Sequence, residues 1–166
     1  MNVVLIGLGS MGYNLAKNIV SKNYQVNAFE KDKLVFENIK KDKIENLCLF
    51  NSIKELIKNT PSPRMIMLSL PADKIDECIN ELINYLNSED IVADLGNSLY
   101  LKSIEREKLL KQYNISFLGI GVSGGPRGAK KGPAIMAGGS KCAWGKVKYI
   151  FEDIAAKNES HSACCY

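Results

Sequence analysis

A glycine-rich segment near the N-terminus is the first candidate for chemistry. Gly7-Leu8-Gly9-Ser10-Met11-Gly12 has the pattern G-x-G-x-x-G and lies between an apolar run, residues 2–6, and a helical pattern, residues 10–21. In such a turn the first glycine permits a tight bend, the second leaves room for a pyrophosphate, and the third lets helix and strand pack closely. The free N–H groups at the helix start attract phosphate. The segment therefore predicts a dinucleotide site, and the alternative is a glycine-rich turn of another α/β protein.

An acidic residue follows where the dinucleotide-binding pattern expects one. Glu30 ends a predicted strand, residues 25–29, about 20 residues after the glycines. A carboxylate there accepts hydrogen bonds from the adenosine ribose and repels a 2′-phosphate. Lys31 and Lys33 act in the opposite direction, because either could neutralise a phosphate, although both could equally be solvated lysines at a helix start. We expect NAD or NADP as the cofactor, with NAD preferred.

Two further polar segments follow predicted strands. The amide of Asn97, in Asp94-Leu95-Gly96-Asn97-Ser98, can both donate and accept, which suits a carboxamide or a sugar hydroxyl. Ser98 is expected mainly to cap the next helix. Ser123, Gly124 and Gly125 belong to a loop, residues 121–128, whose N–H groups could bind an anion or a carboxylate. A tight connection without a ligand is the alternative for that loop.

The elements that must position these segments alternate along the chain. Strands are expected at residues 2–6, 25–29, 47–50, 64–70, 91–95, 115–122 and 134–137. Helices are expected at residues 10–21, 31–41, from 51 or 52, around 75–86, 98–112 and around 144–154. This alternation predicts an α/β fold of the Rossmann type, with a doubly wound, mostly parallel sheet and helices on both faces. Ligands in such sheets bind beyond the carboxyl ends of the strands, so we expect the polar segments to meet at one edge.

Composition limits the classes of function. The 166 residues suffice for one domain, and the net charge of +4 is too small and scattered for a nucleic-acid surface. No apolar run approaches the roughly 20 residues that span a membrane. The five cysteines lack metal-ligand spacing, so we expect no metal site and reduced thiols in the cytoplasm. The single histidine, His161, makes a histidine-based catalytic triad implausible.

Several segments together resemble the 6-phosphogluconate dehydrogenase family. They are GLGSMG at 7–12, GNSLY at 96–100, GVSGGPRGAKKGPAIMAGG at 121–139, and KCAWGKVKYIFEDIAAK followed by CCY up to residue 166. The resemblance covers essentially the whole chain. It implies roles for the following residues: Gly7 to Gly12 on the pyrophosphate; Glu30, Lys31 and Asp32 on the adenosine ribose; Ser69, Leu70 and Pro71 flanking the dinucleotide; Asn97 touching cofactor and substrate; and Ser123, Gly124 and Gly125 holding the sugar acid.

The resemblance also implies an activity, the oxidative decarboxylation of the sugar-acid phosphate 6-phosphogluconate to ribulose 5-phosphate in the pentose phosphate pathway. The family's catalytic lysine and glutamate lie on a helix beyond the CC segment, so we expect this chain to lack both, and its own sequence leaves the catalytic residues unknown. Residues 1–157 are expected to form the dinucleotide-binding domain, with 158–166 a tail leading toward a C-terminal helical domain of a homodimer. A β-hydroxyacid dehydrogenase domain and a non-catalytic dinucleotide-binding module are the alternatives.

Three departures from the family pattern concern the ligands. The ribose segment lacks the arginine that the family uses for NADP, Pro126 and Arg127 stand in place of two acidic residues, and Leu95 replaces a glycine. They bear on cofactor preference and substrate geometry rather than on the fold.

Overall fold

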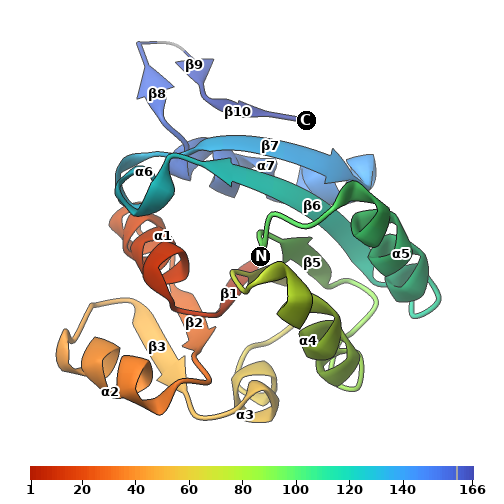
Figure 1. Ribbon diagram of the computed structural model, residues 1–166, viewed down its shortest axis with the longest axis horizontal. Coiled ribbons are helices and arrows are strands. Elements are labelled where there is room, and N and C mark those ends of the chain that lie inside the picture. The colour runs from red at the N-terminus through yellow and green to blue at the C-terminus, as the bar shows by residue number, and fades with distance from the viewer. Residues whose placement is uncertain (160) are drawn as a thin grey trace.

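The computed structural model describes residues 1–159 and 161–166 and is built around one eight-stranded sheet (Figure 1). In spatial order its strands are β10-β7-β6-β5-β4-β1-β2-β3. Their bounds are β1 Asn2–Ile6, β2 Val26–Phe29, β3 Leu47–Phe50, β4 Arg64–Leu68, β5 Ile91–Asp94, β6 Ser116–Ser123, β7 Ala134–Gly139 and β10 Cys164–Cys165. Strands β8, Lys157–Asn158, and β9, His161–Ser162, pair separately.

The predicted fold class is confirmed by the pairing. All neighbouring strands of the main sheet are parallel except β6 and β7, which are antiparallel. The order β3-β2-β1-β4-β5-β6 is that of a Rossmann sheet, in which the chain direction across the sheet reverses between β1 and β4. That reversal opens a crevice beyond the carboxyl ends of the two strands.

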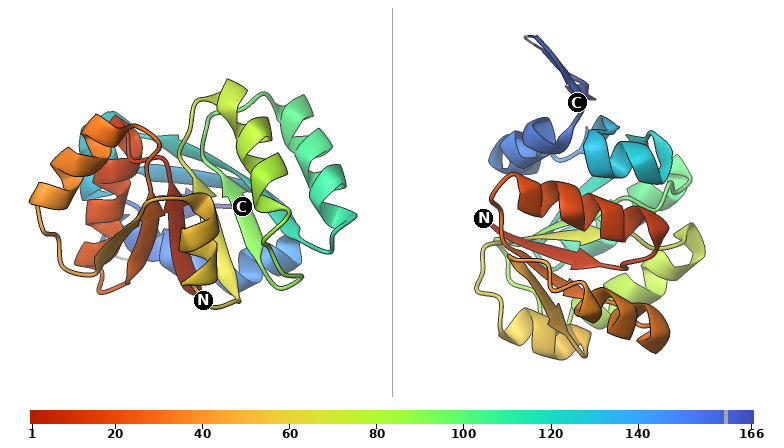
Figure 2. Two further views of the ribbon diagram at one scale, coloured as in Figure 1. Left: turned by 90° about the horizontal axis from the view of Figure 1, so that it is seen from below. Right: turned by 90° about the vertical axis from the view of Figure 1, so that its left-hand side faces the viewer.

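Helices cover both faces of the sheet, as Figure 2 shows. They are α1 Ser10–Ser21, α2 Lys33–Lys41, α3 Ile53–Lys58, α4 Ile75–Leu82, α5 Tyr100–Lys111, α6 Gly125–Lys131 and α7 Lys141–Ile154, with a 3₁₀ turn, η1, at Ala72–Lys74. Alternate residues of a strand face opposite sides, so Val3 and Leu5 pack with α1 and α7, whereas Val4 and Ile6 pack with α3 and α4. The buried strands β1, β4 and β5 therefore appear in the sequence as short apolar runs.

The segment after Ser123 was predicted as a loop, and that prediction is wrong from residue 125 onward, where α6 begins. Proline in the first turn is compatible with a helix, because the first N–H groups lack intrahelical partners anyway. A distant side chain holds α6 in place. Buried Asn18 of α1 donates from Nδ2 to the carbonyl oxygens of Ala129, at 3.0 Å, and of Ile154, at 2.8 Å. Tertiary contacts with α1 thus make a helix of a glycine-rich segment.

Two helix starts also differ from the sequence prediction. Helix α2 begins at Lys33 instead of Lys31, because the Asp32 carboxylate accepts from the backbone N–H groups of Leu34 and Val35. Helix α5 begins at Tyr100, and Ser98 is not its N-cap. The hydroxyl of Ser98 instead accepts a hydrogen bond from Arg106 at 2.6 Å.

The end of the chain joins the main sheet through β10, which pairs in parallel with β7. The Tyr166 hydroxyl donates to the Gly139 carbonyl oxygen at 2.6 Å, and its ring stacks on Trp144. The domain boundary after residue 157 stays a prediction, and residue 160 of that tail lies outside the described residues. Within the described ranges, no helix is long and apolar enough to cross a membrane, and no group of three or more histidine, cysteine, aspartate or glutamate side chains is arranged to hold a metal ion.

Candidate nucleotide-binding site

A cleft of about 590 Å³ lies beyond the carboxyl ends of β1, β4, β5 and β6. Four separate stretches of the chain line it, together with Met136 of β7. They are Gly9, Ser10, Met11 and Gly12; Ser69, Leu70 and Pro71; Leu95, Gly96 and Asn97; and Gly121, Val122 and Ser123. The structure therefore brings together most of the residues that the sequence singled out, at the edge of the sheet where a ligand is expected.

The three glycines of the turn have different surroundings. Gly7 has φ +91°, and a Cβ there would lie 2.4 Å from the Ser69 carbonyl oxygen. A Cβ on Gly12 would lie 2.0 Å from the Gly7 carbonyl oxygen. A Cβ on Gly9 would meet nothing within 4 Å in the part of the chain that the structure describes, and Gly9 is exposed in the cleft. The fold thus requires Gly7 and Gly12, whereas Gly9 keeps space open beside the start of α1.

The start of α1 presents backbone donors to that open space. Gly9 is the N-cap, and no described side chain accepts a hydrogen bond from the first turn of this helix. The first N–H groups of a helix have no intrahelical partners and lie at the positive end of its dipole. This arrangement can bind a phosphate group through its backbone.

Glu30, which follows β2 and does not line the cleft, is used by the fold. Its Oε2 accepts from the Leu8 backbone N–H at 2.6 Å, and its Oε1 accepts from the Asp32 N–H at 2.9 Å. The carboxylate therefore ties the glycine turn to the end of β2, a role that the sequence analysis missed. Each carboxylate oxygen has further lone pairs, so hydrogen bonds from a ribose are still possible.

A second hollow, of about 420 Å³, lies beside the end of β2 and is lined by the apolar side chains of Ile6, Phe29, Ile53 and Leu70. Cys78 also lines it, and burial raises the pKa of its thiol to about 12, so the thiol is neutral there. Charged groups form the rim, where Lys31 Nζ lies 3.3 Å from Glu77 Oε1. Lys74 and Glu81 also contribute to it. An apolar hollow with a polar rim suits a flat heteroaromatic ring with a sugar at its edge.

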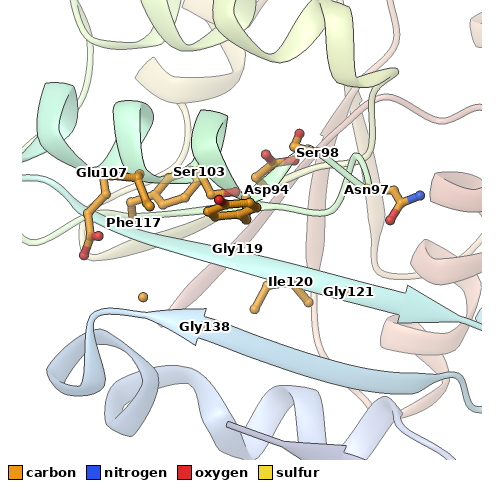
Figure 3. A pocket seen from close by; sticks show the side chains of 13 residues that line it. Asp94, Asn97, Ser98, Ser103, Glu107, Phe117, Gly119, Ile120, Gly121 and Gly138 are labelled. Atoms are coloured by element: carbon orange, nitrogen blue, oxygen red, sulfur yellow. The ribbon is translucent and has the colours of Figure 1, made fainter.

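The loop after β5 carries Asn97 at the far end of the cleft. Asn97 has φ +55°, a left-handed conformation that asparagine tolerates better than most residues. The preceding Gly96 donates its N–H to Asp94 Oδ1 at 2.8 Å, and a Cβ on Gly96 would lie 2.7 Å from the Leu70 carbonyl oxygen. Figure 3 shows the side chains of Asp94 and Ser98 next to each other and the Asn97 amide pointing away from them.

A buried arginine that the sequence analysis did not single out lies beneath this loop. Arg106 of α5 has 3% of its side chain exposed and donates to Asp76 Oδ1 at 2.5 Å, Asp94 Oδ2 at 2.7 Å and Ser98 Oγ at 2.6 Å. Burial disfavours the charged guanidinium, but the Asp76 hydrogen bond and the Asp94 charge outweigh it and raise the pKa of Arg106. In the sequence it is one more charged residue of a mostly polar helix.

The predicted substrate loop lies on the opposite side of the cleft. Ser123 lines the cleft, whereas Gly124 and Gly125, with φ +133° and +61°, lead from it into α6. A neighbouring groove of about 350 Å³ runs between α5 and β6, and shares Asn97 and Gly121 with the cleft (Figure 3). Lys31 and Asp32 lie outside the cleft, at the end of β2.

Comparisons with known proteins match nearly the whole chain to one family. Residues 2–166 match the family model described as the NAD binding domain of 6-phosphogluconate dehydrogenase. The chain is 41% identical over 164 residues to "6-phosphogluconate dehydrogenase, decarboxylating" of Buchnera aphidicola, which covers 98% of this chain and 35% of that protein. The corresponding protein of Chlamydia muridarum is 39% identical over 168 residues, covering 99% and 35%. The chain thus spans about a third of the length of these relatives.

Solved structures agree with the sequence comparisons. Plasmodium falciparum 6-phosphogluconate dehydrogenase, described in its apo form and in complex with NADP+ and with 6-phosphogluconate, superposes with a TM-score of 0.93 at 34% identity. The match covers 100% of this chain and 36% of that chain. A Mycobacterium tuberculosis 3-hydroxyisobutyrate dehydrogenase reaches a TM-score of 0.81 at 20% identity, covering 94% of this chain and 52% of that one. This second likeness shows a shared fold.

Proposed function

Since the chain belongs to the 6-phosphogluconate dehydrogenase family as its NAD-binding domain, we propose that it binds NAD or NADP across the carboxyl edge of the sheet, with NAD preferred. The observation that carries this proposal is the open space over Gly9, where a Cβ would meet no atom of the described residues within 4 Å. The pyrophosphate would bind the backbone N–H groups at the start of α1. The bound nicotinamide would supply the hydride acceptor.

Residues of the cleft and of the neighbouring end of β2 have roles that fit the two ends of a dinucleotide. Glu30 would accept from the adenosine ribose, while the hollow beside Phe29 and Leu70 would hold the adenine. Asn97 would lie at the nicotinamide end, where its amide can bind both cofactor and substrate. Ser123 would hold the sugar acid from the opposite side of the cleft.

The NAD preference rests on charge near the ribose. Glu30 places a carboxylate at the end of β2, and Lys31, which could neutralise a 2′-phosphate, is paired with Glu77. Titration calorimetry of the purified chain with NAD and with NADP tests both statements. We expect NAD to bind at least as tightly as NADP. Clearly tighter binding of NADP would contradict the preference, and binding of neither would refute the proposed function.

We further propose that the complete protein oxidises and decarboxylates 6-phosphogluconate, a sugar-acid phosphate, in the cytoplasm and as a homodimer. The identities of 41% and 39% to proteins named for that reaction support this reading over a β-hydroxyacid dehydrogenase, whose fold likeness comes with 20% identity. This chain would provide the cofactor half of the site. Neither Asn97 nor Ser123 has a side chain basic enough to take a proton from the substrate hydroxyl.

A further inference from the structure

The guanidinium of Arg106 joins the two loops that form one wall of the cleft. Besides Asp76, Asp94 and Ser98, it donates to the Ala72 carbonyl oxygen at 3.2 Å. Ala72 begins η1 directly after Pro71, where the loop that follows β4 ends, and Ser98 lies just after Asn97, in the loop that follows β5. One buried side chain therefore fixes the distance between the two loops.

Arg106 contacts residues that precede and follow Asn97 in the sequence. On one side, Asp94 accepts from Arg106 through Oδ2 and from the Gly96 N–H through Oδ1. On the other side, the Ser98 hydroxyl accepts from Arg106. Asn97 itself is exposed and has a left-handed backbone, and the hydrogen bonds of Gly96 and Ser98 fix the residues on either side of it.

We propose that Arg106 is a positioning residue of the cofactor site, which holds the Asn97 amide in place for the nicotinamide end of the dinucleotide. This inference rests on the proposed function. An arginine suits the task because its planar fork carries five donors and can reach several acceptors at once, whereas a lysine ammonium is a single point charge.

A second buried pair in the chain provides a matched control. Arg64 begins β4, and its Nη2 lies 2.6 Å from Oδ2 of Asp90, which precedes β5. Both side chains are as buried as Arg106, but they lie at the amino ends of these strands, across the sheet from the cleft. Loss of either arginine removes a buried cation from an aspartate, and only Arg106 contacts the loops of the cleft.

The test compares NAD with ADP-ribose, which has the adenosine and pyrophosphate parts but lacks the nicotinamide. We expect Arg106→Met to weaken NAD binding roughly 3- to 10-fold relative to ADP-ribose, as for the loss of one hydrogen bond. Asn97→Ala should lower the ratio of NAD affinity to ADP-ribose affinity by the same factor. The double variant should lower this ratio no further, because the two changes remove one interaction. Ser98→Ala should lower it in the same direction and by less, which keeps the test available if Arg106→Met does not fold.

The control and the outcomes separate positioning from stability. Arg64→Met should lower the melting temperature and leave the ratio of NAD to ADP-ribose affinity unchanged. The proposal is overturned if Arg106→Met or Ser98→Ala weakens both ligands equally, if Asn97→Ala leaves the ratio unchanged, or if the double variant is additive. If the unaltered chain binds neither ligand, the proposed function fails instead.

Discussion

Adding one methyl group at Gly12 should lower stability, whereas adding one at Gly9 should weaken binding, although the two residues lie in the same turn. In Gly12→Ala the new Cβ would lie 2.0 Å from the Gly7 carbonyl oxygen and 3.0 Å from Ser69 Oγ. Ordinary contacts of a Cβ are 3.4 to 4 Å, so α1 and the turn must separate by more than 1 Å. Overpacking of this kind costs about 1–3 kcal/mol.

We expect the upper part of that range for Gly12→Ala, because backbone atoms that cannot rotate away make the contact. In a domain of this size about 1 kcal/mol lowers the melting temperature by 2–4 °C. A destabilisation of about 2–3 kcal/mol therefore predicts a fall of roughly 4–12 °C.

Gly9→Ala should leave the melting temperature within about 2 °C, because its φ of −62° suits alanine and its Cβ meets nothing within 4 Å among the described residues. Its effect should fall on binding. A charge-assisted hydrogen bond contributes about 1.5–3 kcal/mol, so the loss of one from backbone N–H to phosphate weakens NAD binding roughly 10- to 150-fold.

Thermal melting by circular dichroism and calorimetric titration with NAD measure the two effects on the same samples. The reasoning is refuted if Gly9→Ala melts as low as Gly12→Ala, since the space over Gly9 would then belong to the fold. It is also refuted if Gly9→Ala binds NAD as tightly as the unaltered chain.

Three further predictions concern charge and chemistry. Glu77→Gln should free Lys31 from its ion pair and raise the affinity for NADP relative to NAD about threefold at low salt. Glu81→Gln, on the same rim, should change this ratio of affinities less. Equal ratios for the two variants would contradict the role of the ion pair. The purified 166-residue chain should give no NADPH or NADH absorbance with 6-phosphogluconate, because the residues proposed to contact the substrate carry no strongly basic side chain, and a general acid or base contributes about 10²–10⁴-fold. Robust turnover would overturn this. Burial of Asp90 favours its protonated form, but hydrogen bonds from Arg64 outweigh this and lower its pKa, so its stabilisation is full above about pH 4 and is lost as the pH falls through the folded pKa. Asp90→Asn should therefore show a smaller loss of melting temperature between about pH 5 and 2.

The sequence predicted those parts of the fold that depend on local pattern. Buried parallel strands such as β4 appear as apolar runs, and Gly7 and Gly12 occupy positions where the fold leaves no room for a Cβ. The same pattern placed Asn97 and Ser123 at one edge of the sheet.

What the sequence could not supply depends on contacts between distant residues. Helix α6 is held by Asn18, 111 positions before Ala129, and its own glycines and proline favour a loop. Ser98 has the residue type of an N-cap but is bound by Arg106. Glu30 has a position typical of a ribose ligand, and its hydrogen bond to Leu8 depends on how closely the glycine turn approaches β2.

The order in which the chain adds strands to the sheet reverses between β1 and β4, so the cleft also lies over a seam between two halves of the sheet. Strands β1, β2 and β3 form one half, and β4 to β7 with β10 form the other; within the sheet they meet at a single ladder from Asn2–Arg64 to Ile6–Leu68. A dinucleotide that touches Gly9 on one side and Asn97 on the other would bridge both halves. It would oppose their separation, adding about 2.7 kcal/mol at a ligand concentration of 100 Kd. The backbone N–H of Ser69, which donates to Ile6 across the seam, should then exchange its hydrogen with solvent more slowly when the cofactor is bound.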